Sequence, residues 1–195
     1  MIKDCTAIIL AGGDSQRMGR DKANLLLGEQ TLLQRVIATM QKTFPHVIVS
    51  VRQPRPEINL PQVCDDLRYA GPLAGLAAGL GHIATPWAFV VACDMPFVEP
   101  AIIELLATYR PEYQAVVPVV QGHPQTLTAF YAGSCLGTIR ALLLAGGKNS
   151  LRAILEQLQV RYVDEAELLK ADPALRSFFD LDTPQDVAVA INGVK

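Results

Sequence analysis

Short apolar runs, separated by longer mixed stretches, are the feature that most constrains how this chain can fold. The clearest runs are TAIILA at 6–11, HVIVSV at 46–51, WAFVVAC at 87–93 and AVVPVV at 115–120. They are largely apolar without strict alternation, which is typical of strands buried on both faces. Such strands, alternating with helices, predict an α/β fold whose mostly parallel sheet is covered by helices on both faces.

Helices are predicted between these strands. Thr31 and Gln34 have the spacing of a capping box, and apolar residues then follow at helical intervals. The other predicted helices are 73–83, 100–109 and 135–145, with weaker strands at 63–65, 126–131 and 178–181. A last helix should open at Asp182-Thr183-Pro184, where Thr183 can cap it and proline suits the first turn.

The length and composition favour a single folded domain. The 195 residues suit one domain over 1–195, and 50% hydrophobic with 18% charged residues excludes a disordered chain. The net charge of −2 does not favour a general nucleic-acid binder.

Targeting signals and redox motifs are not predicted. The apolar stretch 72–80 is about half the length that a membrane helix needs, and residues 1–5 do not resemble a signal peptide, so we expect a cytoplasmic protein without a membrane partner. The four cysteines lack C-x-x-C spacing and are expected to be small apolar side chains in a reducing compartment. They are Cys5, Cys64, Cys93 and Cys135.

Ligands of such sheets bind outside the carboxyl ends of the strands, where LAGGDSQRMGRDK follows the first strand at 10–22. Its adjacent glycines can bring backbone N–H groups close to phosphate oxygens. Arg17 and Lys22 add positive charge where a triphosphate carries about four negative charges. The loop lacks both the Walker A ending and the G-x-G-x-x-G pattern, and a solvated turn is the alternative interpretation.

Two further segments follow later strands. In GPLAG, Gly71 and Gly75 allow a helix start to come close to a ligand or to the sheet, although a small-residue packing face is the alternative. Asp94 directly follows the strand at 87–93, where a carboxylate is well placed to hold Mg²⁺ against phosphate oxygens. An aspartate that merely precedes a turn is the alternative there.

The run L-A-G-G-x-S-x-R-M-G-x-D-K resembles the signature loop of the molybdenum cofactor guanylyltransferases. This resemblance implies a single-domain Rossmann-like nucleotidyltransferase fold. It also implies transfer of GMP from GTP to the phosphate of a molybdopterin-type cofactor, with release of pyrophosphate. The Gly12-Gly13 pair is more similar to the guanylyl branch than to the cytidylyl branch, which usually has Ala-Gly there.

The resemblance also implies which residues bind the nucleotide. Arg17, Lys22 and Asp94 are the expected catalytic residues, and one of the neighbours Asp65 and Asp66 should contact the nucleotide. Ser50 stands where guanylyl relatives often have asparagine, which weakens the guanine assignment. The expected nucleotide-binding residues are Leu10, Ala11, Gly12, Gly13, Lys22, Ser50, Asp65, Asp66, Gly71 and Asp94.

Metal and acceptor sites are implied in the same way. The C-D-M-P sequence around Asp94 is similar to the metal-binding position of the family, so Mg²⁺, or alternatively Mn²⁺, is expected there. Phe179-Asp180-Leu181-Asp182-Thr183-Pro184 is similar to the closing F-x-N-x-N-T-P segment, and Asp180 or Asp182 could be a second metal ligand. His123, Pro124 and Gln125 resemble the acceptor-side loop, although a simple turn is the alternative.

Several alternatives remain at this point. Within the enzyme class they are a cytidylyltransferase or a nucleotidyltransferase for another small phosphate. Outside it they are a nucleotide-binding regulator and an interaction scaffold, because fold alone does not decide function. Lys22 and Asp94 are present, which favours the enzyme. Its expected partners are GTP, a molybdopterin-type cofactor and other proteins of molybdenum cofactor biosynthesis.

Overall fold

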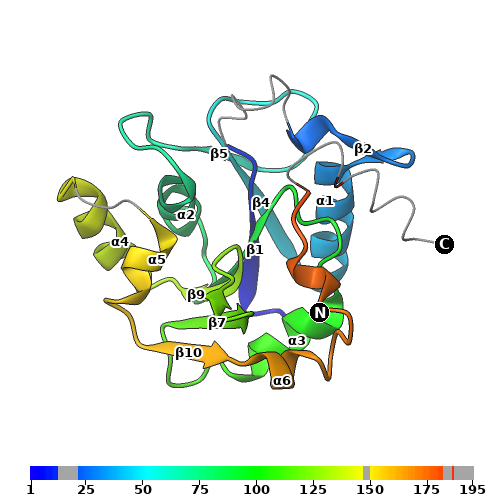
Figure 1. Cartoon of the computed structure of the whole chain (residues 1–195). Helices are drawn as coiled ribbons and strands as arrows, with labels where there is room; N and C mark the ends of the chain where they lie inside the picture. The colour runs from blue at the N-terminus through cyan, green and yellow to red at the C-terminus, as the bar shows by residue number, and fades with distance from the viewer. Residues whose placement is uncertain (13–21, 147–149, 182–185, 187–195) are drawn as a thin grey trace.

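The computed structural model describes residues 1–12, 22–146, 150–181 and 186. The expected site residues Gly13, Arg17 and Asp182 therefore lie outside the described residues, as does the helix expected at Asp182-Thr183-Pro184. Figure 1 shows a central sheet with helices on both sides. No helix within the described part of the chain is long and apolar enough to span a membrane.

The main sheet has the strand order β10-β7-β9-β6-β1-β4-β5, with β8 paired to β7. Strand β1 is parallel to both β4 and β6, and β9 runs antiparallel to β6 and β7. The mostly parallel α/β sheet is thus confirmed. The strands are β1 (Cys5–Leu10), β4 (His46–Val51), β5 (Gln62–Cys64), β6 (Trp87–Ala92), β7 (Ala115–Val120), β8 (His123–Pro124), β9 (Thr128–Ala132) and β10 (Val160–Val163).

Two apolar clusters, one on each face, hold helices against the sheet. On one face α1 (Leu32–Thr43), α3 (Pro100–Thr108) and α6 (Glu165–Leu168) surround the rings of Phe44, Phe89 and Phe130. The centroids of Phe89 and Phe130 lie 5.0 Å apart, a favourable aromatic spacing. The other face carries α2 (Pro72–Leu80), α4 (Cys135–Leu144) and α5 (Leu151–Leu155).

Helix α1 begins with the predicted capping box. The backbone N–H of Gln34 donates to Oγ1 of Thr31 over 3.1 Å, and the N–H of Thr31 donates to Oε1 of Gln34 over 2.8 Å. A 3₁₀ turn, η2 (Lys22–Asn24), and a small hairpin of β2 (Leu26–Leu27) and β3 (Gln30–Thr31) lead into the helix. These elements anchor the far end of the first loop.

The strand predicted at 178–181 is wrong. The structure instead has a 3₁₀ turn, η3 (Arg176–Phe178), which follows Leu175 in a left-handed conformation with φ of 50°. The apolar side chain of Leu181 packs against Leu27 and Leu32 rather than within the sheet. Its backbone N–H donates to the carbonyl of Asp94 over 2.9 Å, which ties this segment to the end of β6.

Candidate active site

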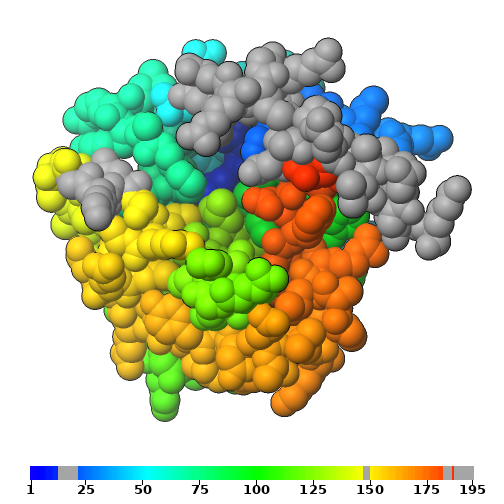
Figure 2. Space-filling view, in the orientation of Figure 1, coloured from blue at the N-terminus to red at the C-terminus, as the bar shows by residue number. Residues whose placement is uncertain are grey.

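A pocket lies at the carboxyl ends of β1, β4, β5 and β6. Figure 2 shows the corresponding hollow, where the blue N-terminal segment lies deep between the teal segment of α2 and the orange to red segment near the C-terminus. The strands end level with one another, because Leu10 pairs with both Ser50 and Ala92. The lining residues are Leu10, Ala11, Gly12, Lys22, Ser50, Asp65, Gly71, Pro72, Gly75, Ala92, Cys93, Asp94 and Leu127.

One end of the pocket carries a lysine and a carboxylate. The Nζ atom of Lys22 lies 3.4 Å from Oδ2 of Asp94, and both side chains are only partly exposed. Lys22 comes from η2 after the first loop, whereas Asp94 follows β6. The lysine can neutralise phosphate oxygens, and the carboxylate beside it can hold a metal ion.

The Asp94 carboxylate lies in an environment that disfavours its charge. Burial raises the pKa of Asp94, although the positive charge of Lys22 opposes the rise, and the negative charge of Asp180 adds to it. The interacting carboxylates of Asp94 and Asp180 form a donor set that suits Mg²⁺ or Mn²⁺, which take oxygen ligands. No cluster of three or more potential metal ligands occurs within the described ranges, so substrate oxygens and water would complete such a site.

The other end of the pocket carries a buried hydroxyl and carboxylate. Ser50 is the last residue but one of β4, and Asp65 directly follows β5. The Oγ atom of Ser50 donates to Oδ1 of Asp65 over 2.5 Å, and the two residues are 1% and 8% exposed. Burial raises the pKa of Asp65, while the bond from Ser50 and the charge of Arg52 act against the rise.

Glycines bring the backbone close to this second end. A Cβ atom at Gly12 would lie 2.8 Å from Oδ2 of Asp65, and one at Gly75 would lie 2.9 Å from Oγ of Ser50. Gly71 caps α2 with φ of 90°, a conformation that other residues rarely adopt. The sequence GPLAG therefore builds the wall of the pocket as well as the start of a helix.

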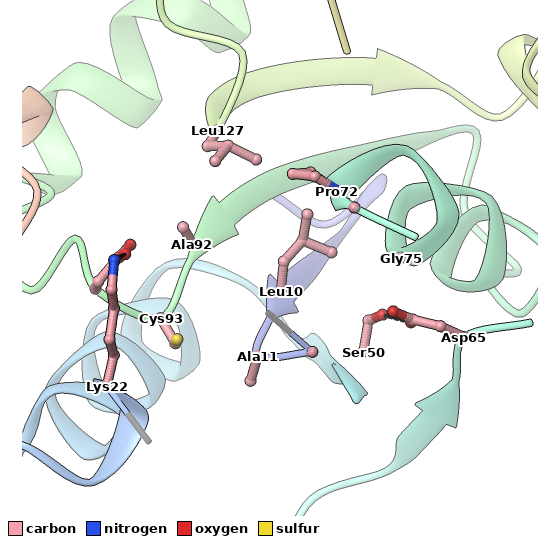
Figure 3. A pocket seen from close by; sticks show the side chains of 13 residues that line it. Leu10, Ala11, Lys22, Ser50, Asp65, Pro72, Gly75, Ala92, Cys93 and Leu127 are labelled. Carbon is pink, nitrogen blue, oxygen red and sulfur yellow. Dashed lines mark hydrogen bonds and ion pairs between the residues drawn. The ribbon is translucent and has the colours of Figure 1, made fainter. Parts of the chain in front are cut away.

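The two polar ends face each other across an apolar floor. In Figure 3, Lys22 lies on one side and Ser50 with Asp65 on the other, with Leu10 and Ala11 between them. Asp94 follows β6 and Asp65 follows β5, three strand spacings apart in the sheet, or about 14 Å. An elongated ligand with a charged end and a polar end suits this arrangement.

Eight of the ten predicted nucleotide-binding residues line this pocket, and Gly13 lies outside the described residues. Asp66 does not line it. Its exposed carboxylate pairs with Arg68 over 2.6 Å, and this partner lowers the pKa of Asp66 to about 2. His123, Pro124 and Gln125 also lie outside the lining, in and beside the short β8 strand, whereas Leu127 reaches it.

Sequence comparisons identify the family to which this fold and pocket belong. Residues 7–162 match the MobA-like NTP transferase domain. The chain belongs to this family. It is 34% identical to a probable molybdenum cofactor guanylyltransferase of Pelotomaculum thermopropionicum, over 95% of this chain and 91% of that protein. A similarly named protein of Chloroflexus aggregans is 35% identical, over 93% and 91%.

A solved structure supports the same conclusion for the MobA-like family. Molybdopterin-guanine dinucleotide biosynthesis protein A from Archaeoglobus fulgidus superposes with a TM-score of 0.85 and 27% identity, covering 97% of this chain and 98% of the other. Membership in the family makes this chain a nucleotidyltransferase and confirms the resemblance of its first loop.

Sequence reasoning missed two residues that shape the MobA-like pocket. Arg52 approaches the first loop, since a Cβ atom at Gly12 would lie 3.3 Å from its Cγ atom, and its charge acts on Asp65. Leu127 lies near the start of β9 and forms part of the lining. Arg52 directly follows β4, so its place at a strand end is the signal that could have identified it.

Proposed function

We propose that this enzyme transfers GMP from GTP to the terminal phosphate of a molybdopterin-type cofactor and releases pyrophosphate. The observation that carries the proposal is the pocket itself, in which Lys22 with Asp94 and Ser50 with Asp65 occupy opposite ends. A nucleoside triphosphate has matching ends, one strongly anionic and one rich in hydrogen-bonding groups. The relatives named as guanylyltransferases support guanine and a molybdenum cofactor.

The reaction at the phosphate end is an in-line displacement. An oxygen of the acceptor phosphate forms a bond to the α-phosphorus of GTP, the bond from that phosphorus to the bridging oxygen breaks, and pyrophosphate leaves with the electron pair. Such transfers depend on positioning and charge neutralisation and need no protein nucleophile. In our proposal Lys22, the backbone at Gly12 and Gly13, and Arg17 neutralise the phosphate oxygens.

Asp94 is the proposed metal ligand, with Asp180 or Asp182 as the second. The interaction of Asp94 with Asp180 and the raised pKa of Asp94 fit a site that binds a divalent cation. These carboxylates would hold Mg²⁺, or Mn²⁺ in its place, and the ion would supply positive charge that offsets the charge developing on the phosphates. Lys22 then holds the Asp94 carboxylate and the phosphates within one charge network.

The end of the pocket that carries Ser50 and Asp65 binds the base in this proposal, and its chemistry favours guanine. An ionised carboxylate only accepts hydrogen bonds. Guanine presents a ring N–H and an amino group side by side, whereas cytosine presents a single amino donor on the corresponding edge. Asp65 therefore suits guanine better than cytosine, and its position in the lining makes it the better candidate than Asp66.

The acceptor would approach from the β9 side of the pocket. Leu127 lines this side, and the segment His123–Gln125, which we propose as part of the acceptor site, precedes it along the chain. Other proteins of molybdenum cofactor biosynthesis are the proposed partners that deliver or receive the cofactor.

Thermal unfolding with Mg²⁺ and GTP, CTP, ATP or UTP in turn tests the nucleotide. A ligand at 100 times its Kd adds about 2.7 kcal/mol, which raises the Tm of a chain this size by roughly 5–10 °C. We expect the rise with GTP alone. Asp94→Ala should abolish it, whereas Glu104→Ala, an exposed carboxylate of α3, should not. Pyrophosphate release that depends on both GTP and molybdopterin then tests the acceptor.

The alternatives predict different outcomes. A rise in Tm with CTP alone would assign a cytidylyltransferase and contradict the guanine proposal. GTP binding without pyrophosphate release would favour a nucleotide-binding regulator. If none of the four nucleotides raised the Tm, the scaffold interpretation would replace the proposed function.

A further inference from the structure

Ser50 and Asp65 form a hydrogen-bonded pair that is almost closed off from solvent. The Oγ–Oδ1 distance is 2.5 Å, with exposed fractions of 1% for Ser50 and 8% for Asp65. Figure 3 shows the two side chains pointing toward each other from neighbouring strand ends. A serine hydroxyl can donate one hydrogen bond, and here Ser50 donates it to Asp65.

The two glycines fix how this pair is oriented. Gly75 lies on the side of Oδ1, since a Cβ atom there would be 2.9 Å from Ser50 Oγ and 3.5 Å from Asp65 Oδ1. Gly12 lies on the side of Oδ2, where its Cβ atom would be 2.8 Å away. One carboxylate oxygen is thus bound to Ser50, and the other is directed toward the first loop, where the nucleotide is proposed to bind.

We propose that Ser50 is a positioning residue that acts on the nucleotide through Asp65 and makes no donor contact of its own. This inference rests on the proposed function, in which Asp65 accepts hydrogen bonds from the nucleotide. Because the hydroxyl donates to Oδ1, it holds the carboxylate plane and keeps Oδ2 available on the side of Gly12. The serine therefore orients Asp65, whereas an asparagine at this position could donate a hydrogen bond from its amide to the nucleotide directly.

The negative charge of the Asp65 carboxylate explains why the hydrogen bond from Ser50 can fix its orientation. A hydrogen bond to an ionised carboxylate is shorter and stronger than one between neutral groups. Without Ser50, the buried carboxylate loses a donor and the restraint on its rotation. Arg52 still supplies positive charge nearby, so Asp65 keeps an electrostatic partner but loses its fixed orientation.

A double-mutant cycle of Ser50→Ala, Asp65→Asn and the combined variant tests this role. Calorimetry with GTP and Mg²⁺ gives Kd, and pyrophosphate release gives kcat and KM. We expect Ser50→Ala to raise Kd and KM for GTP about tenfold, because a carboxylate without a fixed orientation weakens the charge-assisted hydrogen bond between the nucleotide and Asp65, with kcat nearly unchanged. In the Asp65→Asn background, Ser50→Ala should have no further effect on Kd.

Two outcomes would overturn the role of Ser50. These are an unchanged Kd in Ser50→Ala, and equal effects of Ser50→Ala with and without the Asp65 carboxylate, as expected for a direct contact or simple packing. Thermal unfolding without nucleotide checks that all variants fold. The affinities of the wild-type protein for the four nucleotides test the proposed function separately, and the same cycle can be measured with whichever of them binds.

Discussion

Lys22 and Asp94 are 72 positions apart in the sequence, yet the Nζ atom of one lies 3.4 Å from Oδ2 of the other. Strands β1 and β6 are adjacent and parallel with level carboxyl ends, and Asp94 after β6 lies at this edge of the sheet, where it meets Lys22 of η2. Lys22 belongs to η2 and Asp94 follows β6, so the two charges come from separate segments of the chain. Together they create a partly enclosed site where electrostatic interactions are stronger than in open solvent.

Replacing Lys22 with alanine should lower kcat by roughly 10²–10³-fold, the scale of losing one well-placed group that stabilises transition-state charge. Pyrophosphate release with GTP, Mg²⁺ and molybdopterin measures this. Lys42→Ala removes an exposed lysine near the end of α1 and serves as the matched control. Near-normal turnover of Lys22→Ala would refute the catalytic role of the lysine.

Gly75→Ala should weaken nucleotide binding by about tenfold or more, or at least 1.4 kcal/mol. The added Cβ atom would lie 2.9 Å from Ser50 Oγ and 3.1 Å from Leu10 Cδ2. Both residues line the pocket, so the added methyl group would displace side chains of the binding site. Calorimetric titration with GTP is the measurement.

Gly79→Ala is the control for Gly75, since both glycines belong to α2. Its Cβ atom would lie 2.7 Å from Cδ1 and Cγ2 of Ile8 in the core. Overpacking of this kind costs about 1–3 kcal/mol of unfolding free energy, while GTP affinity of the folded protein should be unchanged. If Gly79→Ala weakened GTP binding as much as Gly75→Ala, a specific effect at the pocket would be excluded.

The sequence was sufficient to predict the centre of the sheet and the edge where the pocket lies. Strands β1, β4 and β6 are buried on both faces, so their apolar runs are visible without tertiary information. The direction of β9 could not be predicted from the sequence, because its antiparallel pairing depends on where the neighbouring strands lie. The strand β10 was missed, since its residues VRYV expose Tyr162 and form no apolar run.

The choice between Asp65 and Asp66 shows which signal could have been used. Val63 and Asp65 are buried, whereas Cys64 and Asp66 are exposed, as the two-residue alternation of an extended segment requires. An assignment of Val63 to the sheet core would have placed Asp65 on the same side. By contrast, the apolar residues at 178–181 gave a misleading strand pattern. Leu181 packs against α1 and the β2 hairpin, Phe178 packs against the larger core cluster, and Phe179 is exposed.

Phe89→Ala should lower the free energy of unfolding by about 3–5 kcal/mol, the usual cost of truncating a buried aromatic side chain. Its ring lies 5.6 Å from that of Phe44 and 5.0 Å from that of Phe130, measured between centroids. Urea denaturation measures the loss. Phe179→Ala, at a position that is 42% exposed, should change stability by less than about 0.5 kcal/mol. A similar cost at both positions would contradict this description of the core.

Asp65→Asn should stabilise the nucleotide-free protein at pH 7 while weakening nucleotide binding. Burial raises the pKa of Asp65 above its ordinary value of 3.8, so the folded chain holds this proton to a higher pH than the unfolded chain. The contribution of Asp65 to the free energy of unfolding is therefore complete below pH 3.8. It is lost as the pH rises through the pKa of Asp65 in the folded chain. An asparagine has no charge to bury, so its advantage over aspartate should grow with pH across this range.

Asp66→Asn provides a control of opposite sign at the neighbouring position. Arg68 lowers the pKa of Asp66 from 3.8 to about 2, so the contribution of Asp66 is present above 3.8 and is lost as pH falls through the folded pKa. Urea denaturation of both variants and the wild type between pH 2 and 7 should therefore give difference curves of opposite sign. Because the surface pair is solvent-screened, the Asp66 curve should also be the shallower one. Curves of the same sign would contradict the opposite environments described for the two carboxylates, buried for Asp65 and exposed for Asp66.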